Sequence, residues 1–474
     1  MHFSIPDTQE LLDEAGNSFT AFNINVNGVF HCAVRYKQLH NFHEQIKKSF
    51  SSSLDLPPFP PKKILSLTSI QLEERRCLLE RYIQIISQEP LISNSDIFNG
   101  FLLNAQQETQ QAEPKPVTLD VCLMNGHKIT CSITSTDQTD SVLESVASKI
   151  ELGDEFVYYF GLFLVRKESN GDNSIVRKLQ DFESPFISLK AALKDGVHRI
   201  VLRKCIWDPS IEDDLMDNRI AMNLLYVQAV NDIERGWVLA SKEQHRQLAA
   251  LQNKGSKKEY LRLARTLKFY GFIQFKACYT DYPQPDCRVV IYAGNRELVF
   301  RVQTANDQIK EGLFKVTRMR CWRITTTYPD SVNGSGDDHL SNAGQLELAF
   351  EYLIAKDTLK WIRITSEEAI LMSMCLQGMV DELLMKKHGK RMKRPQDRNK
   401  KSAASTNFLK RDGASNIFGA ETEDGSTAQK ARESVKKIQD KFSAVSIKTS
   451  SGVGNLRGPS QNDAFEDAIG DDDL

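Results

Sequence analysis

Leu54-Asp55-Leu56-Pro57-Pro58-Phe59-Pro60-Pro61-Lys62-Lys63 is the stretch that decides how the first hundred residues of this 474-residue chain fold. Its prolines exclude a helix, so it must form a loop between the helical patterns at 37–50 and 70–88. Two apolar-alternating runs, 19–26 and 29–36, precede it and meet at Asn27-Gly28, a pair typical of a hairpin turn. We therefore predict a first domain over residues 1–108.

The periodicity then changes three times along the chain. A second hairpin around Asn125-Gly126, a helix over 142–150 and further strands predict a ubiquitin-like roll over residues 116–205. Helical periodicity, with a capping box at Ser256-x-x-Glu259, predicts a helical lobe over 206–272. A strand-rich lobe follows over 273–390, with strands at 289–292, 297–302, 314–326, 346–354 and 359–364.

The last predicted helix begins at the capping box Thr365-x-x-Glu368 and runs to about residue 388. Residues 391–474 contain few large apolar side chains, so they cannot bury enough surface to offset the entropy of ordering. We expect a disordered tail there, and a polar loop over 330–344. The expected fold class is α+β with several domains.

Composition excludes several classes of function. The 61 Lys and Arg residues against 62 Asp and Glu give a net charge of -1, which argues against a nucleic-acid partner. Nine cysteines without a C-x-x-C pair indicate reduced thiols and predict neither a disulfide framework nor a zinc site. The apolar runs fall far short of the ~20 residues that span a bilayer, so membrane contact should be peripheral.

Catalytic motifs were sought and none was found. The sequence lacks a G-x-S-x-G elbow, a phosphate-binding G-x-x-x-x-G-K-[ST] loop, a G-x-G-x-x-G turn and an H-E-x-x-H pair. His40-x-x-His43-Glu44 approaches a metal-ligand pattern, but it is typical of a solvated helix surface. We therefore expect no enzyme activity, no cofactor and no metal.

A spaced set of cations points to a phosphoinositide headgroup. Arg35 and Tyr36 end the first hairpin, Lys62 closes the proline loop, and Arg75 begins a helix, with Arg76 as its alternative. A guanidinium grips a phosphate with two hydrogen bonds, an aromatic face supports the inositol ring, and an ammonium neutralises a second phosphate. Taken singly, each of these residues has a simpler interpretation as a solvated surface side chain.

This pattern, together with the lobes after it, resembles the PX-FERM sorting nexins over nearly the whole chain. The resemblance implies that Arg35 holds the 3-phosphate of phosphatidylinositol 3-phosphate and that Tyr36 stacks on the inositol. It further implies that Lys62 meets the 1-phosphate and Arg75 the ring hydroxyls. The expected fold is then a PX domain followed by a FERM-like module of ubiquitin-like, helical and PTB/PH-like lobes.

Two leucines beside the proline loop are the candidates for a membrane-inserting tip. Leu54 and Leu56 are apolar and adjoin the loop that carries Lys62. The resemblance implies that they enter the bilayer. Packing inside the domain is the alternative, and the sequence does not decide between the two.

A peptide groove is expected in the last lobe. The helix over 368–387 is apolar on nearly every side, so one side should face a groove, and the neighbouring strand 318–323 offers an edge for β-augmentation. The resemblance implies that this groove takes Asn-Pro-x-Tyr or Asn-x-x-Tyr motifs of receptor tails of the lipoprotein receptor, integrin β and amyloid precursor types. Candidate residues are Arg320, Trp322, Leu353, Val380 and Leu384, although Trp322 and Leu353 also fit a buried core.

Two segments of the tail carry hypotheses of their own. The end Ile469-Gly470-Asp471-Asp472-Asp473-Leu474 combines two apolar anchors with three aspartates, which suits a basic pocket with apolar floors. The resemblance implies that this partner is the retriever complex of the Commander assembly. Asn462-x-x-Phe465 mimics the cargo motif, so the tail is expected to fold back into the groove and compete with cargo.

The resemblance thus implies a non-enzymatic adaptor in the cytoplasm, peripheral on the cytosolic face of early endosomes. The resemblance implies that such a protein recycles receptors to the cell surface and away from lysosomal degradation. A FERM-type linker between membrane and cytoskeleton is the alternative function. The set Arg35, Lys62 and Arg75 favours the adaptor.

Overall fold

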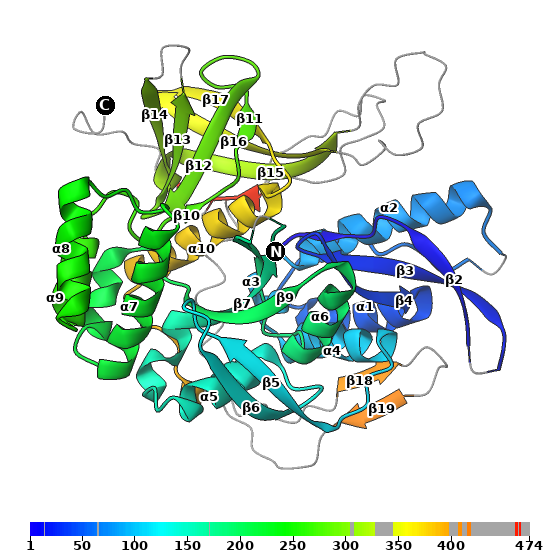
Figure 1. Cartoon of the computed structure of the whole chain (residues 1–474). Coiled ribbons are helices and arrows are strands. Elements are labelled where there is room, and N and C mark those ends of the chain that lie inside the picture. Colours follow the sequence, from blue (N-terminus) through cyan, green and yellow to red (C-terminus); the bar gives the residue numbers. More distant parts are fainter. Residues whose placement is uncertain are drawn as a thin grey trace. The chain divides into compact units, whose positions relative to one another are not determined.

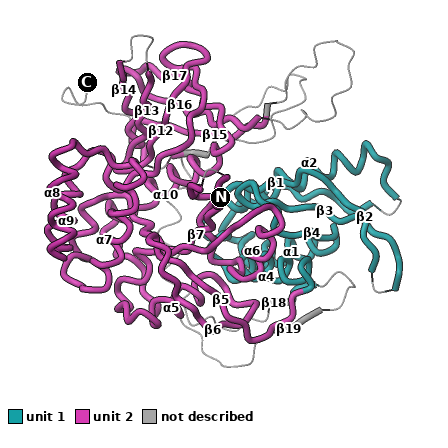
Figure 2. The backbone as a smooth tube through the Cα atoms, in the orientation of Figure 1, with its two compact units in different colours: residues 1–111, 399–456 teal, residues 112–398, 457–474 magenta. Residues whose placement is uncertain are grey.

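The computed structural model describes residues 1–13, 15–63, 66–169, 171–303, 308–327, 345–397, 406–409, 415–418, 460–462 and 464–465 (Figure 1). The chain forms two compact units (Figure 2). Unit 1 comprises residues 1–111 and 399–456, and unit 2 comprises residues 112–398 and 457–474. Among the described residues, no helix is both long enough and apolar enough to cross a membrane.

The sheet of unit 1 is built on the first hairpin. Strands β3 (Ser18–Val26) and β4 (Val29–Arg35) pair antiparallel, and β1 (Phe3–Ser4) and β2 (Thr8–Leu12) pair with opposite ends of β3. Asn27 and Gly28 have φ angles of 50° and 81°, the positive values that this two-residue turn requires. The predicted hairpin is confirmed.

The helices of unit 1 pack on this sheet around an aromatic core. Phe3, Phe22, Phe42 and Phe98 are fully buried, and the edge of Phe3 meets the ring of Phe98 at 5.8 Å between centroids. The proline-rich stretch is a loop between the first two helices, as predicted. The helices are α1 (Tyr36–Phe50), α2 (Ser69–Ile86), α3 (Pro90–Ser93) and α4 (Asp96–Thr109), and a further hairpin contains β18 (Thr406–Leu409) and β19 (Ser415–Phe418).

The first lobe of unit 2 is a five-stranded sheet in the order β6-β5-β9-β7-β8. The central strand β9 runs parallel to its neighbour β5, and the remaining pairs are antiparallel, as in the predicted ubiquitin-like roll. The elements are β5 (Pro116–Cys122), β6 (Lys128–Thr134), α5 (Thr139–Lys149), η1 (Asp154–Tyr159), β7 (Phe160–Lys167), β8 (Asn173–Lys178), α6 (Pro185–Ala192), η2 (Leu193–Asp195) and β9 (His198–Lys204).

The second lobe is helical, with η3 (Pro209–Leu215), α7 (Arg219–Glu234), α8 (Lys242–Asn253) and α9 (Lys257–Ala264). The capping box predicted at Ser256 is wrong. Ser256 precedes α9, but its side chain makes no capping hydrogen bond, and its ψ of 66° departs from the extended conformation typical of a cap. The capping box of this lobe lies at Ser241 and Gln244, at the start of α8.

The third lobe carries a sheet in the order β14-β13-β12-β11-β17-β16-β15-β20. The single strand predicted over 314–326 is wrong, because the turn η4 (Val316–Arg318) divides it into the end of β14 and the start of β15. The loop predicted over 330–344 lies outside the described residues. The strands are β10 (Ile273–Gln274), β11 (Cys278–Thr280), β12 (Cys287–Gly294), β13 (Glu297–Gln303), β14 (Ile309–Lys315), β15 (Met319–Thr327), β16 (Gln345–Ala355), β17 (Thr358–Thr365) and β20 (Ser460–Gln461).

The helix of this lobe, α10 (Ala369–Lys387), begins differently from the prediction. Thr365 still belongs to β17, and the residue before the helix is Glu368. The Glu368 carboxylate accepts a hydrogen bond of 2.7 Å from the backbone N–H of Lys276, so it does not complete a capping box with Thr365. The Glu368 side chain therefore bonds a residue distant in sequence instead of making the local hydrogen bond of the predicted capping box.

Helix α10 is apolar on nearly every side because it packs in two directions (Figure 1). One side covers the third-lobe sheet, and the same apolar cluster extends into first-lobe residues such as Phe163 and Val201. The side-chain carboxylate of Glu382 accepts hydrogen bonds from the backbone N–H groups of Trp207 and Asp208, at 2.8 and 2.6 Å. The apolar surplus of this helix therefore needs no peptide groove to account for it.

Candidate lipid and peptide sites

Arg35 lies where β4 ends and α1 begins. Its backbone N–H donates to the Oε1 atom of Gln38 at 2.8 Å, so the side chain of Gln38 closes the first turn of the helix. The Arg35 guanidinium carbon lies 4.0 Å from the centre of the Phe19 ring, and one of its nitrogens lies 3.9 Å from a carboxylate oxygen of Asp13. This side chain is 26% exposed.

Tyr36 joins the proline loop to the second helix. Its hydroxyl donates to the carbonyl oxygen of Pro60 at 2.6 Å. The guanidinium of Arg75 lies over the Tyr36 ring, 4.2 Å from its centre, and donates to the Pro61 carbonyl at 3.1 Å. Burial raises the pKa of Tyr36, and the charge of Arg75 opposes this shift. The hairpin end, the loop and α2 therefore meet at one place.

Lys62 and His40 lie at the same place. Lys62 is exposed, and the ring of His40 lies 6.0 Å from that of Tyr36 and 5.8 Å from that of Phe59. Burial lowers the pKa of His40, and the positive charge of Lys62 lowers it further. The structure thus brings Arg35, Tyr36, Lys62 and Arg75 to one region of unit 1, although they are spread over 41 positions from 35 to 75.

Arg76, the alternative to Arg75, has a structural role. Its guanidinium donates to the backbone carbonyl of Ile5 and pairs with Glu73, and it lies 3.7 Å from Glu80. Its side chain is only 14% exposed. These partners hold the segment after β1 against α2, whereas Arg75 bonds only the proline loop and the Tyr36 ring among the contacts described.

The two leucines proposed for the membrane tip are both half-buried. Leu54 follows the last turn of α1, and its backbone N–H donates to the carbonyl of Phe50 at 2.9 Å. Leu56 lies two residues later, at the start of the proline loop. Partial burial leaves both interpretations of these side chains open.

In the third lobe, the edge of β15 is covered by a segment of the chain's own tail. Ser460 and Gln461 form β20 and pair antiparallel with Trp322 and Cys321. The backbone N–H of Asn462 then donates to the carbonyl of Arg320 at 3.1 Å. Strand addition of this kind is the geometry by which extended peptides bind exposed sheet edges.

Asn462 is the anchor of this tail segment. Its side-chain amide donates to the carbonyls of Val316 and Met319, at 2.7 and 2.5 Å, and the residue is 4% exposed. Its own carbonyl accepts from the backbone N–H of Phe465 at 3.1 Å, which closes a turn, and Ala464 is buried beside it. Asn462-x-x-Phe465 is therefore held as a turn next to the edge strand.

The candidate groove residues lie deeper than the sequence suggested. Trp322 is 1% exposed, and its indole N–H donates to the hydroxyl of Ser373 on α10 at 2.9 Å, so it is a core aromatic that ties β15 to the helix. Val380 and Leu353 are buried with the tail segment in place, and Leu384 is half-buried. Arg320 is half-exposed and pairs with Glu351.

Sequence reasoning missed the acceptors that receive Asn462. They are backbone carbonyls at the turn η4 and at the first residue of β15, and a carbonyl has no signature in the sequence. The only available signal was the Asn-x-x-Phe motif on the other side of the contact. The terminal motif Ile469 to Leu474 lies outside the described residues.

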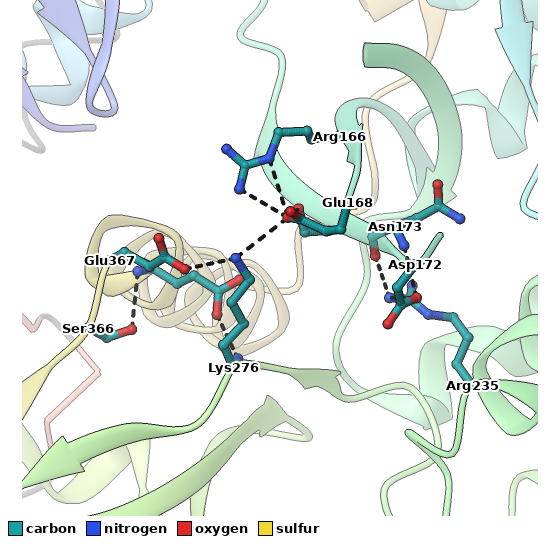
Figure 3. A network of polar contacts seen from close by, with 10 residues as sticks. Arg166, Glu168, Asp172, Asn173, Arg235, Lys276, Ser366 and Glu367 are labelled. Atoms are coloured by element: carbon teal, nitrogen blue, oxygen red, sulfur yellow. Dashed lines mark hydrogen bonds and ion pairs between the residues drawn. The ribbon is translucent and has the colours of Figure 1, made fainter. Parts of the chain in front are cut away.

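A polar network joins the three lobes of unit 2 (Figure 3). Lys276 of the third lobe lies 2.8 Å from Glu367 and 3.5 Å from Glu168 of the first lobe. Hydrogen bonds from Ser174 and Arg166 lower the pKa of Glu168 to about 2. Nearby, Arg235 of the second lobe pairs with Asp172 at 3.3 Å and lies over the ring of Trp237. These contacts border a cavity of about 290 Å³.

Comparison with known proteins identifies four parts of this architecture between residues 22 and 384. Family models match residues 22–105 (PX domain), 117–207 (FERM domain, F1 lobe, of sorting nexins 17, 27 and 31), 208–268 (FERM domain, F2 lobe, of sorting nexins 17 and 31) and 271–384 (sorting nexin 17 FERM C-terminal domain). Sorting nexin-17 of Danio rerio is 48% identical, and sorting nexin-17 of Homo sapiens 47%, each over 100% of both chains. The chain belongs to the sorting nexin-17 family.

A second group of relatives is more distant. Sorting nexin-31 of Homo sapiens is 37% identical over 81% of this chain and 86% of its own length. Membership of the sorting nexin-17 family confirms the resemblance to PX-FERM sorting nexins and the predicted fold class. It places the Arg35 region in the PX domain and the edge strand β15 in the FERM C-terminal lobe.

Proposed function

We propose that this chain is a non-enzymatic endosomal sorting adaptor. In this proposal it acts in the cytoplasm, peripherally on early endosomes, where it binds phosphatidylinositol 3-phosphate and receptor tails that carry Asn-Pro-x-Tyr or Asn-x-x-Tyr motifs. It passes these receptors to retriever and Commander for recycling, away from lysosomal degradation. Membership of the sorting nexin-17 family supports the sorting role. The observation that carries the cargo role is the Asn462 turn held against β15.

The lipid-binding part of the proposal rests on the place where the end of the first hairpin, the proline loop and α2 meet. Arg35 would grip the 3-phosphate, Tyr36 would support the inositol ring, Lys62 would meet the 1-phosphate and Arg75 the ring hydroxyls. The contacts of Tyr36 with Pro60 and with Arg75 support this arrangement, because they fix three separate segments before a ligand arrives. Leu54 and Leu56 would enter the bilayer beside them.

The peptide-binding part of the proposal rests on the two backbone carbonyls that accept the Asn462 side chain, which we call the Asn462 seat. A receptor asparagine would place its amide on the carbonyls of Val316 and Met319, and the preceding residues would pair with β15. In this proposal Arg320 and Leu384 border the seat, whereas Trp322, Leu353 and Val380 form its apolar support. Receptors of the lipoprotein receptor, integrin β and amyloid precursor types are the proposed ligands.

Co-sedimentation of the full-length protein with vesicles tests the proposed lipid binding. Arg35→Ala should abolish binding to vesicles containing phosphatidylinositol 3-phosphate, because one charged hydrogen bond is worth about 1.5–3 kcal/mol, or roughly 10- to 100-fold in affinity. Lys37→Ala, which removes an exposed positive charge two residues away, is the matched control and should bind nearly normally. Equal binding by Arg35→Ala and the wild type would reject the lipid assignment.

Calorimetry of the full-length protein with a receptor-tail peptide tests the proposed peptide binding. A peptide with Asn replaced by Ala should lose binding, because it cannot supply the amide that the two carbonyls accept. Val380→Asp should also prevent binding, since an unpaired carboxylate in an apolar site costs several kcal/mol. Val380 is buried, so Leu384→Asp, at a half-buried position, serves as a second variant. Unchanged affinity in the Asn-to-Ala peptide would place the cargo site elsewhere.

The terminal motif completes the proposal. Ile469 and Leu474 would fill apolar pockets of retriever, and Gly470 with Asp471, Asp472 and Asp473 would face its basic surface. Deletion of Leu474 should abolish capture of purified retriever and leave receptor-peptide affinity unchanged. Retriever capture that survives this deletion would reject the assignment of the terminal motif.

A further inference from the structure

A hairpin beyond the FERM lobes packs within unit 1 against helices α1 and α4. Strands β18 and β19 pair antiparallel, with Phe408 opposite Asn416 and Leu409 opposite Ser415. Strand β18 packs against helices α1 and α4 of the same unit. A segment more than 290 residues away in the sequence therefore adds to the PX fold.

Phe408 is the apolar anchor of this contact. It is 7% exposed, and the centre of its ring lies 6.1 Å from that of Phe101 on α4. Phe101 in turn stacks on Phe42 of α1, with 4.2 Å between centroids and 14° between planes. The hairpin thus extends an aromatic series that begins in the core of the PX domain.

Gln38 supplies the polar half of the contact. Its side-chain nitrogen donates to the backbone carbonyl of Leu409 at 3.1 Å and to a carboxylate oxygen of Glu108 at 2.8 Å. Its side-chain oxygen accepts the backbone N–H of Arg35. Gln38 is 2% exposed, so departure of the hairpin would leave one amide hydrogen of a buried side chain without this acceptor.

We infer that the α1/α4 face of the PX domain is a protein-interaction surface for a β-hairpin with an aromatic anchor, and that strands β18 and β19 are its ligand within this chain. The hairpin acts as a clip. Residues 112–398 are joined to unit 1 through Gln111 at one end, and the clip holds the chain to unit 1 again after the other end. Because Gln38 also holds Arg35, the clip stabilises the first turn of α1.

Hydrogen exchange of the full-length protein, without lipid or peptide, tests the inference. Phe408→Asp should expel the hairpin and speed exchange several-fold in two segments, 35–42 and 101–109, including the N–H of Arg35. Leu91→Asp is the matched control, since Leu91 is a 52% exposed leucine of the same unit, and it should leave both segments unchanged. Equal exchange in Phe408→Asp and the wild type, or an equal rise in the Leu91 variant, would overturn the inference.

A peptide of residues 404–420 provides the second measurement. Added to the full-length Phe408→Asp protein, it should restore protection of both segments, whereas the same peptide carrying Phe408→Asp should not. Failure of the unmodified peptide to restore protection would reject the interaction surface. Neither measurement involves lipid or cargo, so failure here leaves the proposed function untouched, and failure of the lipid test leaves the clip untouched.

Discussion

His43 is an internal support of the proline loop. Its ring stacks on Phe59 of that loop, with 4.7 Å between centroids and 13° between planes, and its Nδ1 atom shares a hydrogen bond of 2.8 Å with the hydroxyl of Tyr82. On sequence alone, His40 and His43 looked like solvated surface residues. Both pack instead around Phe59, so the loop that carries Lys62 has a partly buried footing.

We expect acid to weaken the packing of His43 against the proline loop. Burial lowers the pKa of His43 below its ordinary value of 6.5, His40 and Lys47 lower it further, and Glu44 opposes them. The unfolded chain then binds more protons than the folded one, so stability is complete above pH 6.5 and is lost as the pH falls from 6.5 toward the lowered pKa. Titration of the His43 ring by NMR measures the shift, and His43→Gln should flatten the pH dependence of stability. A His43 pKa at or above 6.5 would contradict this account.

Arg76 should behave as a structural residue. Arg76→Ala removes the guanidinium that bonds the carbonyl of Ile5 and pairs with Glu73 and Glu80, so we expect it to lower the free energy of unfolding by about 1–3 kcal/mol. Arg75→Ala should lower lipid affinity with little loss of stability, since its side chain bonds only a loop carbonyl and a ring face among the contacts described. Thermal melts and vesicle binding of the two variants separate these roles; the reverse assignment would favour Arg76 as the ligand residue.

At the scale of the element, we expect β20 and the turn after it to compete with cargo, because they occupy the edge of β15. Asn462→Ala removes two hydrogen bonds to buried carbonyls, and Phe465→Ala removes the aromatic residue of the motif. At the roughly millimolar effective concentration of a tethered ligand, either change should raise the apparent affinity for a receptor peptide several-fold. Asn455→Ala is the control, since that asparagine has no aromatic residue three positions later. Equal affinities in all three variants and the wild type would remove self-inhibition and leave the edge strand as the cargo site.

Elements were predicted well where a local signal fixes them. The pairs Asn27-Gly28 and Asn125-Gly126 correctly predicted both hairpins, and the prolines correctly predicted the loop. Local signals failed where a distant group competed, as at Glu368, which bonds Lys276 in place of a capping partner. Trp322 likewise packs in the core and bonds Ser373, 51 positions away, and such distant contacts leave no trace in the local periodicity that would separate a core tryptophan from a groove tryptophan.

At the scale of the molecule, α10 connects the third lobe of unit 2 to the rest of that unit. Glu382 is 9% exposed and accepts the backbone N–H groups of Trp207 and Asp208. Burial raises the pKa of Glu382, and these two N–H groups oppose the rise. A carboxylate with two donors is a strong connection between the third lobe and the start of the helical lobe.

Glu382→Ala should therefore destabilise unit 2 as a whole. Each orphaned buried N–H costs about 1–3 kcal/mol, so we expect the free energy of unfolding to fall by roughly 2–5 kcal/mol. All four tryptophans lie between residues 207 and 361, so tryptophan emission during denaturation reports on unit 2 alone. Glu367→Ala, which breaks a more exposed ion pair with Lys276, is the control and should cost less than about 1 kcal/mol. Similar losses in both variants would mean that Glu382 is not a principal connection.

The order in which the chain visits its units has a practical consequence. It passes from unit 1 to unit 2 at residue 112, returns at 399 and leaves again at 457. A recombinant piece that stops at residue 111 lacks β18, and one that covers only 112–398 lacks β20. Such pieces would each present a surface that the intact chain keeps occupied. We therefore expect receptor-peptide affinities measured on the piece 112–398 to be upper limits, which the full-length protein reaches only after β20 has been displaced from β15.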